Sequence, residues 1–258
     1  MKPIPWSQAK DSELEKLRGI CLDIDETLST KGKLTAEAFA ALWELKKKGY
    51  LVVPVTGRPA GWCDHIARFW PVDAVIGENG AFVFYLQNGV RRRLDTPGLE
   101  IDSRQKLAAL GKKILEHFPH AKWASDQNYR ECDLAIDICE DVKPWSSAQV
   151  DQLLDLCQGE GAHAKLSSIH VNAWFGDYDK LKGLKNWLSV GGSGAVDDLL
   201  FIGDSPNDEP LFSAFHKSVG VANLSRYLDR MKSTPRWITL GESGAGFVEM
   251  AARLKKLI

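Results

Sequence analysis

Runs of apolar residues along the chain predict buried strands that alternate with amphipathic helices. Residues 20–22 are continuously apolar, which is typical of a strand buried on both faces of a parallel sheet. The segment 35–49 has a threonine at the N-cap position, apolar residues at helical spacing, three lysines in its last turn and a glycine beyond, which predict a helix. Apolar strands in 50–55 and 73–76, with a helix in 59–70 between them, continue the alternation. We therefore expect an α/β fold with a doubly wound, mainly parallel sheet.

The pattern changes after this first part of the chain. Asn88 and Gly89 lie between two strand-like runs, which is a strong hairpin signal. Beyond them we expect an antiparallel sheet with two helices on one face, and the elements predicted are helices in 103–118 and 146–157 and strands in 132–138 and 164–175. The first pattern resumes near residue 176. The prediction is a core domain formed by residues 1–83 and 176–258, interrupted by an inserted α+β domain at residues 84–175.

Polar residues follow three of the predicted core strands directly. The first strand end contains Asp23, Asp25 and Thr27, and the second contains Thr56 and Arg58 with Gly57 between them. A later strand in 198–204 ends in Gly203 and Asp204, with Asn207 and Asp208 beyond. In open α/β sheets, ligands bind beyond the carboxyl ends of the strands, so these side chains are expected to converge. Carboxylates gathered in this way repel one another unless a cation neutralises them, and Mg²⁺ prefers oxygen ligands shared with a substrate phosphate.

This arrangement predicts phosphoryl-transfer chemistry. Strand alternation places Asp23 and Asp25 on the same side, so that Asp23 can attack phosphorus while Asp25 protonates the leaving oxygen and later activates water. Thr56, the backbone amides that follow it, and a lysine can bind the remaining phosphate oxygens. We select Lys180 as that lysine, because it begins a helix aimed back at the core sheet.

Composition and charge exclude several other classes of protein. The formal net charge of −1 gives no general electrostatic reason to bind nucleic acid or an anionic membrane. The chain has no apolar run long enough to span a bilayer, and its five cysteines form no CxxC pair. We therefore expect a cytoplasmic protein with reduced thiols that acts on a small phosphorylated molecule, with no protein partner predicted.

In these motifs the chain resembles the haloacid dehalogenase-like superfamily of phosphotransferases. The superfamily has four motifs in order, DxDxT, a strand-ending Ser or Thr, a lysine, and GDxxxD, which stand here as DIDET, VTGR, Lys180 and GDSPND. The position of the inserted domain is similar to the subclass with an α/β type IIB cap, which includes Cof-like and sucrose-phosphatase-like enzymes. One departure is that DKLKGLK offers both Lys180 and Lys182 at the third motif, and the apolar positions that follow favour Lys180.

The resemblance implies a role for each matching residue. Asp23 would be nucleophile and metal ligand, and Asp25 acid/base with its carbonyl on the metal. Asp204 would bind Mg²⁺ directly, and Asp208 would support the ion or its waters. The remaining residues implied are Thr56, Gly57, Lys180 and Asn207 on the phosphate and Arg58 and Asn79 near the substrate.

The inserted domain offers a further candidate for choosing the substrate. Alternation in the strand 164–175 places Ile169, Val171 and Ala173 on one face and His170 and Asn172 on the other. If the two helices cover the apolar face, His170 and Asn172 point into the cleft between the inserted domain and the core. We expect them to help select the substrate.

The sequence thus predicts a Mg²⁺-dependent phosphatase of a small metabolite, with a sugar phosphate or glycosyl-acid phosphate favoured, acting through an aspartyl-phosphate. Two alternatives stay open at this point. One is a phosphomutase on the same scaffold, and the other is a non-catalytic phospho-acceptor or metabolite sensor.

Overall fold

The strand predicted from residues 20–22 lies inside the core sheet. In the computed structural model, which describes residues 2–100, 102–191 and 194–257, β2 (Gly19–Leu22) is buried along its whole length. It pairs in parallel with β3 (Leu51–Pro54) on one side and β11 (Leu199–Gly203) on the other. The sheet order is β1-β13-β12-β11-β2-β3, and the other strands are β1 (Ile4–Pro5), β12 (Ser218–Gly220) and β13 (Trp237–Ile238). The predicted α/β fold class is confirmed.

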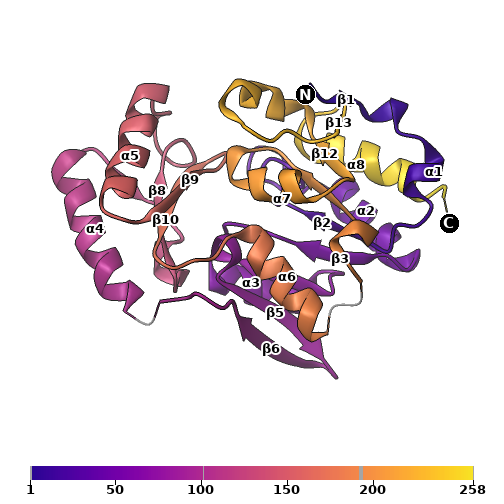
Figure 1. Cartoon of the computed structure of the whole chain (residues 1–258), viewed down its shortest axis with the longest axis horizontal. Helices are drawn as coiled ribbons and strands as arrows, with labels where there is room; N and C mark the ends of the chain where they lie inside the picture. The colour runs from indigo at the N-terminus through magenta and orange to yellow at the C-terminus, as the bar shows by residue number, and fades with distance from the viewer. Residues whose placement is uncertain (1, 101, 192–193, 258) are drawn as a thin grey trace.

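Helices cover both faces of this sheet (Figure 1). On one face α2 (Ala36–Lys47) and α8 (Ser243–Leu254) share a hydrophobic cluster with β2, and on the other face α6 (Lys180–Val190) and α7 (Glu209–Ala214) do so. The remaining core helices are α1 (Asp11–Leu14) and α3 (Ala60–Phe69). The predicted cap of α2 is present, since the Thr35 hydroxyl accepts a hydrogen bond from the Ala38 N–H at 3.2 Å.

The predicted hairpin extends the core sheet. Its strands β5 (Phe82–Gln87) and β6 (Val90–Asp95) pair antiparallel with each other, and β5 also pairs with β4 (Ala74–Gly77). A parallel bridge between Val55 and Ile76 joins this group to the end of β3. We therefore propose that the inserted domain begins near residue 97, after the hairpin, rather than at residue 84.

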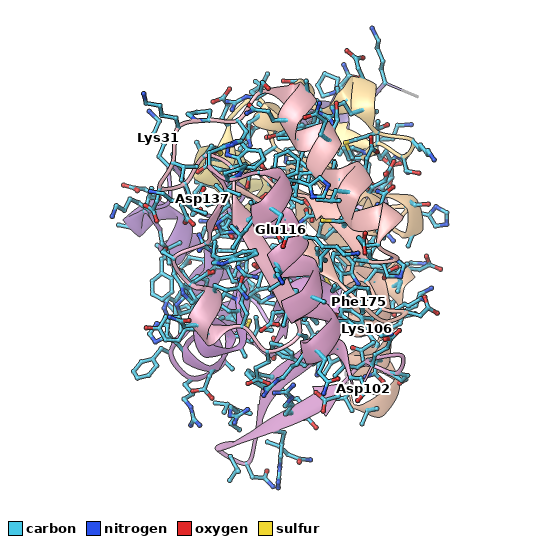
Figure 2. All side chains as sticks on the ribbon, turned by 90° about the vertical axis from the view of Figure 1, so that its left-hand side faces the viewer. Lys31, Asp102, Lys106, Glu116, Asp137 and Phe175 are labelled. Atoms are coloured by element: carbon cyan, nitrogen blue, oxygen red, sulfur yellow. The ribbon has the colours of Figure 1, made fainter. Side chains whose placement is uncertain are left out.

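The inserted domain, called the cap below, is a four-stranded antiparallel sheet of order β7-β8-β10-β9. Its strands are β7 (Lys122–Trp123), β8 (Asp133–Asp137), β9 (His163–Leu166) and β10 (His170–Trp174). Helices α4 (Ser103–His117) and α5 (Ser147–Gly159) pack on one face of it and enclose a hydrophobic cluster of their own. Figure 2 looks at this end of the molecule, with α4 and Glu116 towards the viewer. The opposite face of the cap sheet is therefore left to meet the core.

The single strand predicted at residues 164–175 is wrong, because a tight turn divides this segment into β9 and β10. The Ser167 N–H donates to the His170 carbonyl at 2.9 Å, and the Ser167 hydroxyl accepts from the His170 N–H at 3.0 Å. These local bonds let the chain reverse within a few residues. The Ser168 hydroxyl at the tip donates to the Asp25 carbonyl at 3.4 Å, so the turn reaches the strand ends of the core.

The described part of the chain contains no helix with both the length and the apolar character needed to cross a bilayer. All five cysteines carry free thiols, and four of them are buried.

Candidate active site

Three buried aspartates meet at the carboxyl edge of the core sheet. Asp23 follows β2, and Asp204 and Asp208 follow β11. One carboxylate oxygen from each lies within 4.8 Å of those of the other two. The convergence predicted from the strand ends is thus what the parallel pairing of β2 with β11 produces.

Lys180 lies between two of these carboxylates. Its Nζ donates to Asp23 Oδ1 and to Asp208 Oδ1, at 2.7 Å in each case, and the side chain is buried. The placement follows from the start of α6, where the Asp179 side chain accepts from the Lys182 N–H at 2.8 Å and caps the helix. Lys182 itself points to solvent and pairs with Asp177. Of the two lysines in the predicted motif, Lys180 is therefore the one at the strand ends.

Other polar groups hold the aspartates in place. Asp208 Oδ2 accepts from the backbone N–H groups of Asp204 at 3.0 Å and Ser205 at 3.3 Å. The Asp204 carboxylate accepts from the Thr27 hydroxyl at 3.3 Å and from Asn223 Nδ2 at 3.2 Å. Sequence reasoning missed Asn223 because it did not recognise β12 as a strand. The rule that polar residues follow parallel strands would have found it, since Asn223 lies just beyond β12.

The cluster carries more negative charge than its lysine balances. Burial raises the pKa of Asp23 to about 8, with Asp208 and Asp25 adding to the rise and Lys180 opposing it. Burial and the neighbouring carboxylates of Asp23 and Asp208 also raise the pKa of Asp204 well above its usual range. Three carboxylates facing one ammonium leave an excess of two negative charges when all are ionised. An all-oxygen donor set with this excess fits a hard divalent cation such as Mg²⁺.

The side chain of Asp25 turns away from the cluster and pairs with Arg58. Arg58 Nε donates to Asp25 Oδ2 at 2.9 Å, and Nη2 donates to Oδ1 at 2.7 Å. This two-pronged contact is the strongest geometry for an arginine and a carboxylate. Arg58 follows β3, and its backbone N–H donates to the Thr56 hydroxyl at 3.0 Å. Thr56 is itself fully buried at the end of the same strand.

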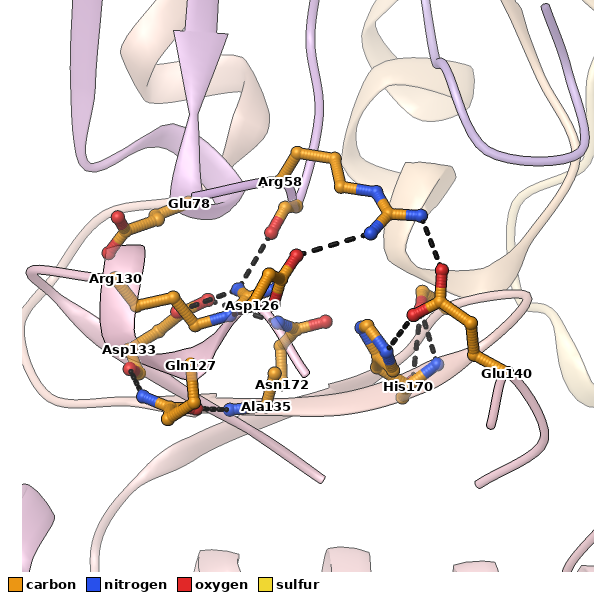
Figure 3. A network of polar contacts seen from close by, with 12 residues as sticks. Arg58, Glu78, Asp126, Gln127, Arg130, Asp133, Ala135, Glu140, His170 and Asn172 are labelled. Carbon is orange, nitrogen blue, oxygen red and sulfur yellow. Dashed lines mark hydrogen bonds and ion pairs between the residues drawn. The ribbon is translucent and has the colours of Figure 1, made fainter. Parts of the chain in front are cut away.

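Arg58 also reaches the cap, as Figure 3 shows. Its Nη1 donates to Asp126 Oδ2 at 3.1 Å, and its Nη2 donates to Glu140 Oε1 at 2.8 Å. His170, a predicted substrate contact, lies with Nε2 2.9 Å from Glu140 Oε2. Hydrogen bonding to His170, together with the nearby Arg58, lowers the pKa of Glu140 to about 2 despite its partial burial. A single arginine therefore links the predicted catalytic acid to two carboxylates of the cap.

A second ionic network joins the core to the cap beside Arg58 (Figure 3). Asn79 and Asn172 both donate to Asp133 Oδ2, at 3.2 and 3.1 Å, so the structure turns these two predicted residues toward each other. Arg130 Nη1 donates to Asp133 Oδ1 at 2.9 Å and to the Gly57 carbonyl at 2.8 Å. Sequence reasoning missed Arg130 and Asp133, since no local pattern distinguishes them from surface charges.

Glu78 provides another link between the core and the cap. Its carboxylate accepts from the N–H of Ala60 at 2.9 Å and from the N–H groups of Glu131 and Cys132 in the cap. Asn207, at the other end of the site, has its Nδ2 3.5 Å from Asn79 Oδ1. The cap is thus held against the strand ends by several buried polar contacts.

Two spaces adjoin the site. An open cleft of about 380 Å³ is lined by Asp25, Glu26, Lys31, Gly32, Arg58, Cys139, Glu140, Ser168, Ile169, Asp204, Asn223, Arg226 and Tyr227. A second cavity of about 10 Å³ lies deeper, between Asp23, Asn207 and the cap turn at residues 167–170. The inner cavity has room for about one water molecule, so a phosphate group can enter only if the cap turn moves away.

We expect Lys180→Met to lower the free energy of unfolding by about 3–5 kcal/mol in metal-free buffer, because it leaves two buried carboxylates without their counter-charge. The control Lys182→Met removes only the exposed pair with Asp177, so its effect on the free energy of unfolding should be much smaller. Urea unfolding of both variants measures the difference. Equal effects of the two substitutions would contradict the role given to Lys180.

Comparisons with known proteins found a matching family model and similar phosphatases. Residues 20–97 match the family model described as haloacid dehalogenase-like hydrolase. A phosphoglycolate phosphatase of Methanosarcina mazei is 27% identical over 239 residues, which cover 91% of this chain and 95% of that protein.

Solved structures show the same fold over nearly the whole chain. A Thermoplasma acidophilum protein is 19% identical with a TM-score of 0.72, covering 94% of this chain and 99% of that one. The sucrose-phosphatase of Synechocystis, solved with sucrose and phosphate, is 16% identical with a TM-score of 0.62, covering 92% and 98%. The predicted superfamily and enzyme class are confirmed. The match over residues 20–97 and the relatives named as phosphoglycolate phosphatases support a haloacid dehalogenase-like phosphatase with an inserted cap.

Proposed function

We propose that the protein is a Mg²⁺-dependent phosphatase that hydrolyses a small phosphorylated metabolite through an aspartyl-phosphate. The observation that carries this proposal is the buried group of Asp23, Asp204 and Asp208 around Lys180, with Asp25 beside it. A binding protein needs no acid two residues beyond the acceptor aspartate, so Asp25 favours catalysis over a sensor.

We assign one part of the reaction to each of the two aspartates. Asp23 attacks phosphorus and forms a bond from its carboxylate oxygen, while the bond from phosphorus to the substrate oxygen breaks. Asp25 gives its proton to that leaving oxygen. In the second half, Asp25 takes a proton from water, the water attacks phosphorus, and phosphate leaves Asp23 free again. The net reaction consumes one water and releases an alcohol and inorganic phosphate.

Residues of both core segments are available to hold the cofactor and the phosphate. Asp23 and Asp204, with the carbonyl of Asp25, would bind Mg²⁺, and Asp208 would orient Asp204 and Lys180 through its contacts with both. When bound, the ion supplies positive charge that offsets the aspartates and the substrate phosphate. The donors assigned to the phosphate oxygens are Thr56, the backbone at Gly57, Lys180 and Asn207.

The cap would control the access of water and substrates to the site. Its turn at residues 167–170 closes the inner cavity, so it has to open for substrate to enter and to close again before reaction. Arg58 and His170 line the boundary between cap and core on the substrate side. Asn79 supports this region indirectly, through Asp133 and Asn207.

Two classes of substrate are candidates. The sequence favours a sugar phosphate or glycosyl-acid phosphate, while the relatives at 27% and 26% identity are phosphoglycolate phosphatases, which act on the phosphate ester of a short acid. Both classes are small enough for a cleft of about 380 Å³.

Phosphate release from sugar phosphates, 2-phosphoglycolate, phosphoglycerates and nucleotides should require Mg²⁺ and fall by about 10³-fold or more in Asp23→Asn, which lacks the nucleophile. Asp177→Asn, which alters an exposed aspartate, is the matched control and should keep full activity. Release that survives in Asp23→Asn would exclude Asp23 as the nucleophile. Conversion of a sugar phosphate to its isomer without free phosphate would instead identify a mutase.

Removing the metal should destabilise the protein. Mg²⁺ at about 100 times its dissociation constant is expected to stabilise the folded chain by about 2.7 kcal/mol over buffer with chelator. Asp204→Asn should lose most of this increment, whereas Glu131→Gln, which alters an exposed acid paired with Arg93, should retain it. Thermal unfolding with Mg²⁺ and with chelator measures the increment. An increment that Asp204→Asn leaves intact would place the ion elsewhere.

A further inference from the structure

Arg58 is surrounded by more carboxylates than one arginine can neutralise. Asp25 accepts from its Nε and Nη2. Asp126 accepts from Nη1 and Glu140 from Nη2, as Figure 3 shows. The guanidinium carbon also lies 4.4 Å from the centre of the Trp62 ring, which fixes the plane of the group. Arg58 is therefore held in a set orientation at the edge of the cleft, with carboxylates on all of its donor edges.

Two of these three carboxylates have fixed positions. Asp126 is buried and its other oxygen accepts from Arg130 Nε at 3.0 Å, so it is part of the joint between cap and core. Asp25 lies three residues beyond β2, and both of its carboxylate oxygens accept from Arg58. Neither one is free to leave Arg58 when a substrate enters.

Glu140 is the most exposed of the three. Its side chain is 24% exposed, against 16% for Asp25 and 6% for Asp126, and it lines the open cleft from the cap side. Its second oxygen has a partner of its own in His170 Nε2 at 2.9 Å. If Glu140 left Arg58, it would keep that partner and gain water from the cleft, so its charge would not be left buried and unpaired.

The backbone under Glu140 is fixed, so only its side chain can move easily. Asp137 is buried at the end of β8, and its Oδ1 accepts from the N–H of Cys139 at 3.0 Å and of Glu140 at 2.7 Å. Its Oδ2 accepts from the N–H of Asp141 at 2.8 Å. The loop thus presents the Glu140 carboxylate to Arg58 from a rigid base.

We infer that Glu140 occupies the place on Arg58 that a carboxylate of the substrate takes, so that the enzyme prefers phosphate esters of short hydroxy acids. The inference rests on the proposed function, because it concerns the leaving-group side of the same site. An arriving carboxylate replaces Glu140 on Arg58 Nη2, and the pairing of charges at the guanidinium is conserved. Esters without an acid group leave Glu140 in place and gain nothing from Arg58.

The position of Asp25 limits the length of such a substrate. Asp25 is to protonate the leaving oxygen, and the same carboxylate lies 2.7 Å from Arg58 Nη2. A carboxylate one or two carbon atoms from the leaving oxygen is therefore within reach of Arg58. A longer chain carries its acid group past the guanidinium, out into the open cleft.

The test compares 2-phosphoglycolate with 2-hydroxyethyl phosphate, an analogue of the same length that has a hydroxyl in place of the carboxylate. The wild type should prefer the acid by about 100-fold in kcat/KM, as expected when one substrate offers a charge-assisted partner and the other does not. Glu140→Gln weakens the competing contact, so it should lower KM for 2-phosphoglycolate by about tenfold and leave KM for the hydroxyethyl ester unchanged. Asp141→Asn, the same change of charge on the neighbouring exposed residue, is the matched control and should alter neither.

Opposite results would overturn the inference. A wild type without preference for the acid would refute the inference. A Glu140→Gln variant whose KM rises only for esters that carry hydroxyls would also refute it, because Glu140 would then bind substrate hydroxyl groups. The thermal stability of the protein with added glycolate distinguishes a failure of the inference from a failure of the proposed function. Thermal unfolding should show a larger shift with glycolate in Glu140→Gln than in the wild type, and no shift in Arg58→Met. Such shifts without release of phosphate from any ester would refute the phosphatase proposal alone, and equal shifts in all three proteins would refute the inference.

Discussion

The buried ammonium of Lys180 between the carboxylates of Asp23 and Asp208 is the interaction on which the rest of the site depends. It ties the first residues of α6, from the second core segment, to the end of β2 in the first. Buried charges are stable only when paired, so the two segments cannot separate without exposing an unpaired group. The pairing is incomplete, because Asp204 adds a third carboxylate. Under the proposed function, that deficit of positive charge makes the site receptive to a divalent cation and, with it, to a phosphate group.

The contact between core and cap follows the same principle with different residues. Arg58 and Arg130 are buried where the cap meets the strand ends, and carboxylates of both domains surround them. Here too the negative groups outnumber the positive ones, but the surplus includes Glu140, which can turn toward water. The inferred exchange at Glu140 thus uses the same ion pairs that hold the cap against the core. In this account, substrate specificity is set at the ion pair of Arg58 with Glu140, because that pair can be exchanged.

The core and its strand ends could be predicted from the sequence because their signals are local. Continuous apolar runs fix the buried strands, and the parallel pairing of β2 with β3 and β11 brings the residues after them together. The short strands β1, β12 and β13 carry too few residues to show a pattern, so Asn223 was missed. The turn at Ser167 was also missed, since its hydrogen bonds depend on side-chain conformation rather than on periodicity. Contacts such as Arg58 with Glu140 join residues far apart in the chain, and only the docking of the cap on the core reveals them.

The most direct test of the central claim is to locate the cation. Crystals grown with Mn²⁺ in place of Mg²⁺ permit this by anomalous scattering, and the account predicts one strong peak between Asp23 and Asp204, with Lys180 still in contact with Asp208. The same data from Asp204→Asn should lack that peak. A wild-type protein with no peak among the aspartates, or with its strongest peak elsewhere in the cleft, would contradict the claim that the unbalanced charge around Lys180 is there to receive a metal ion.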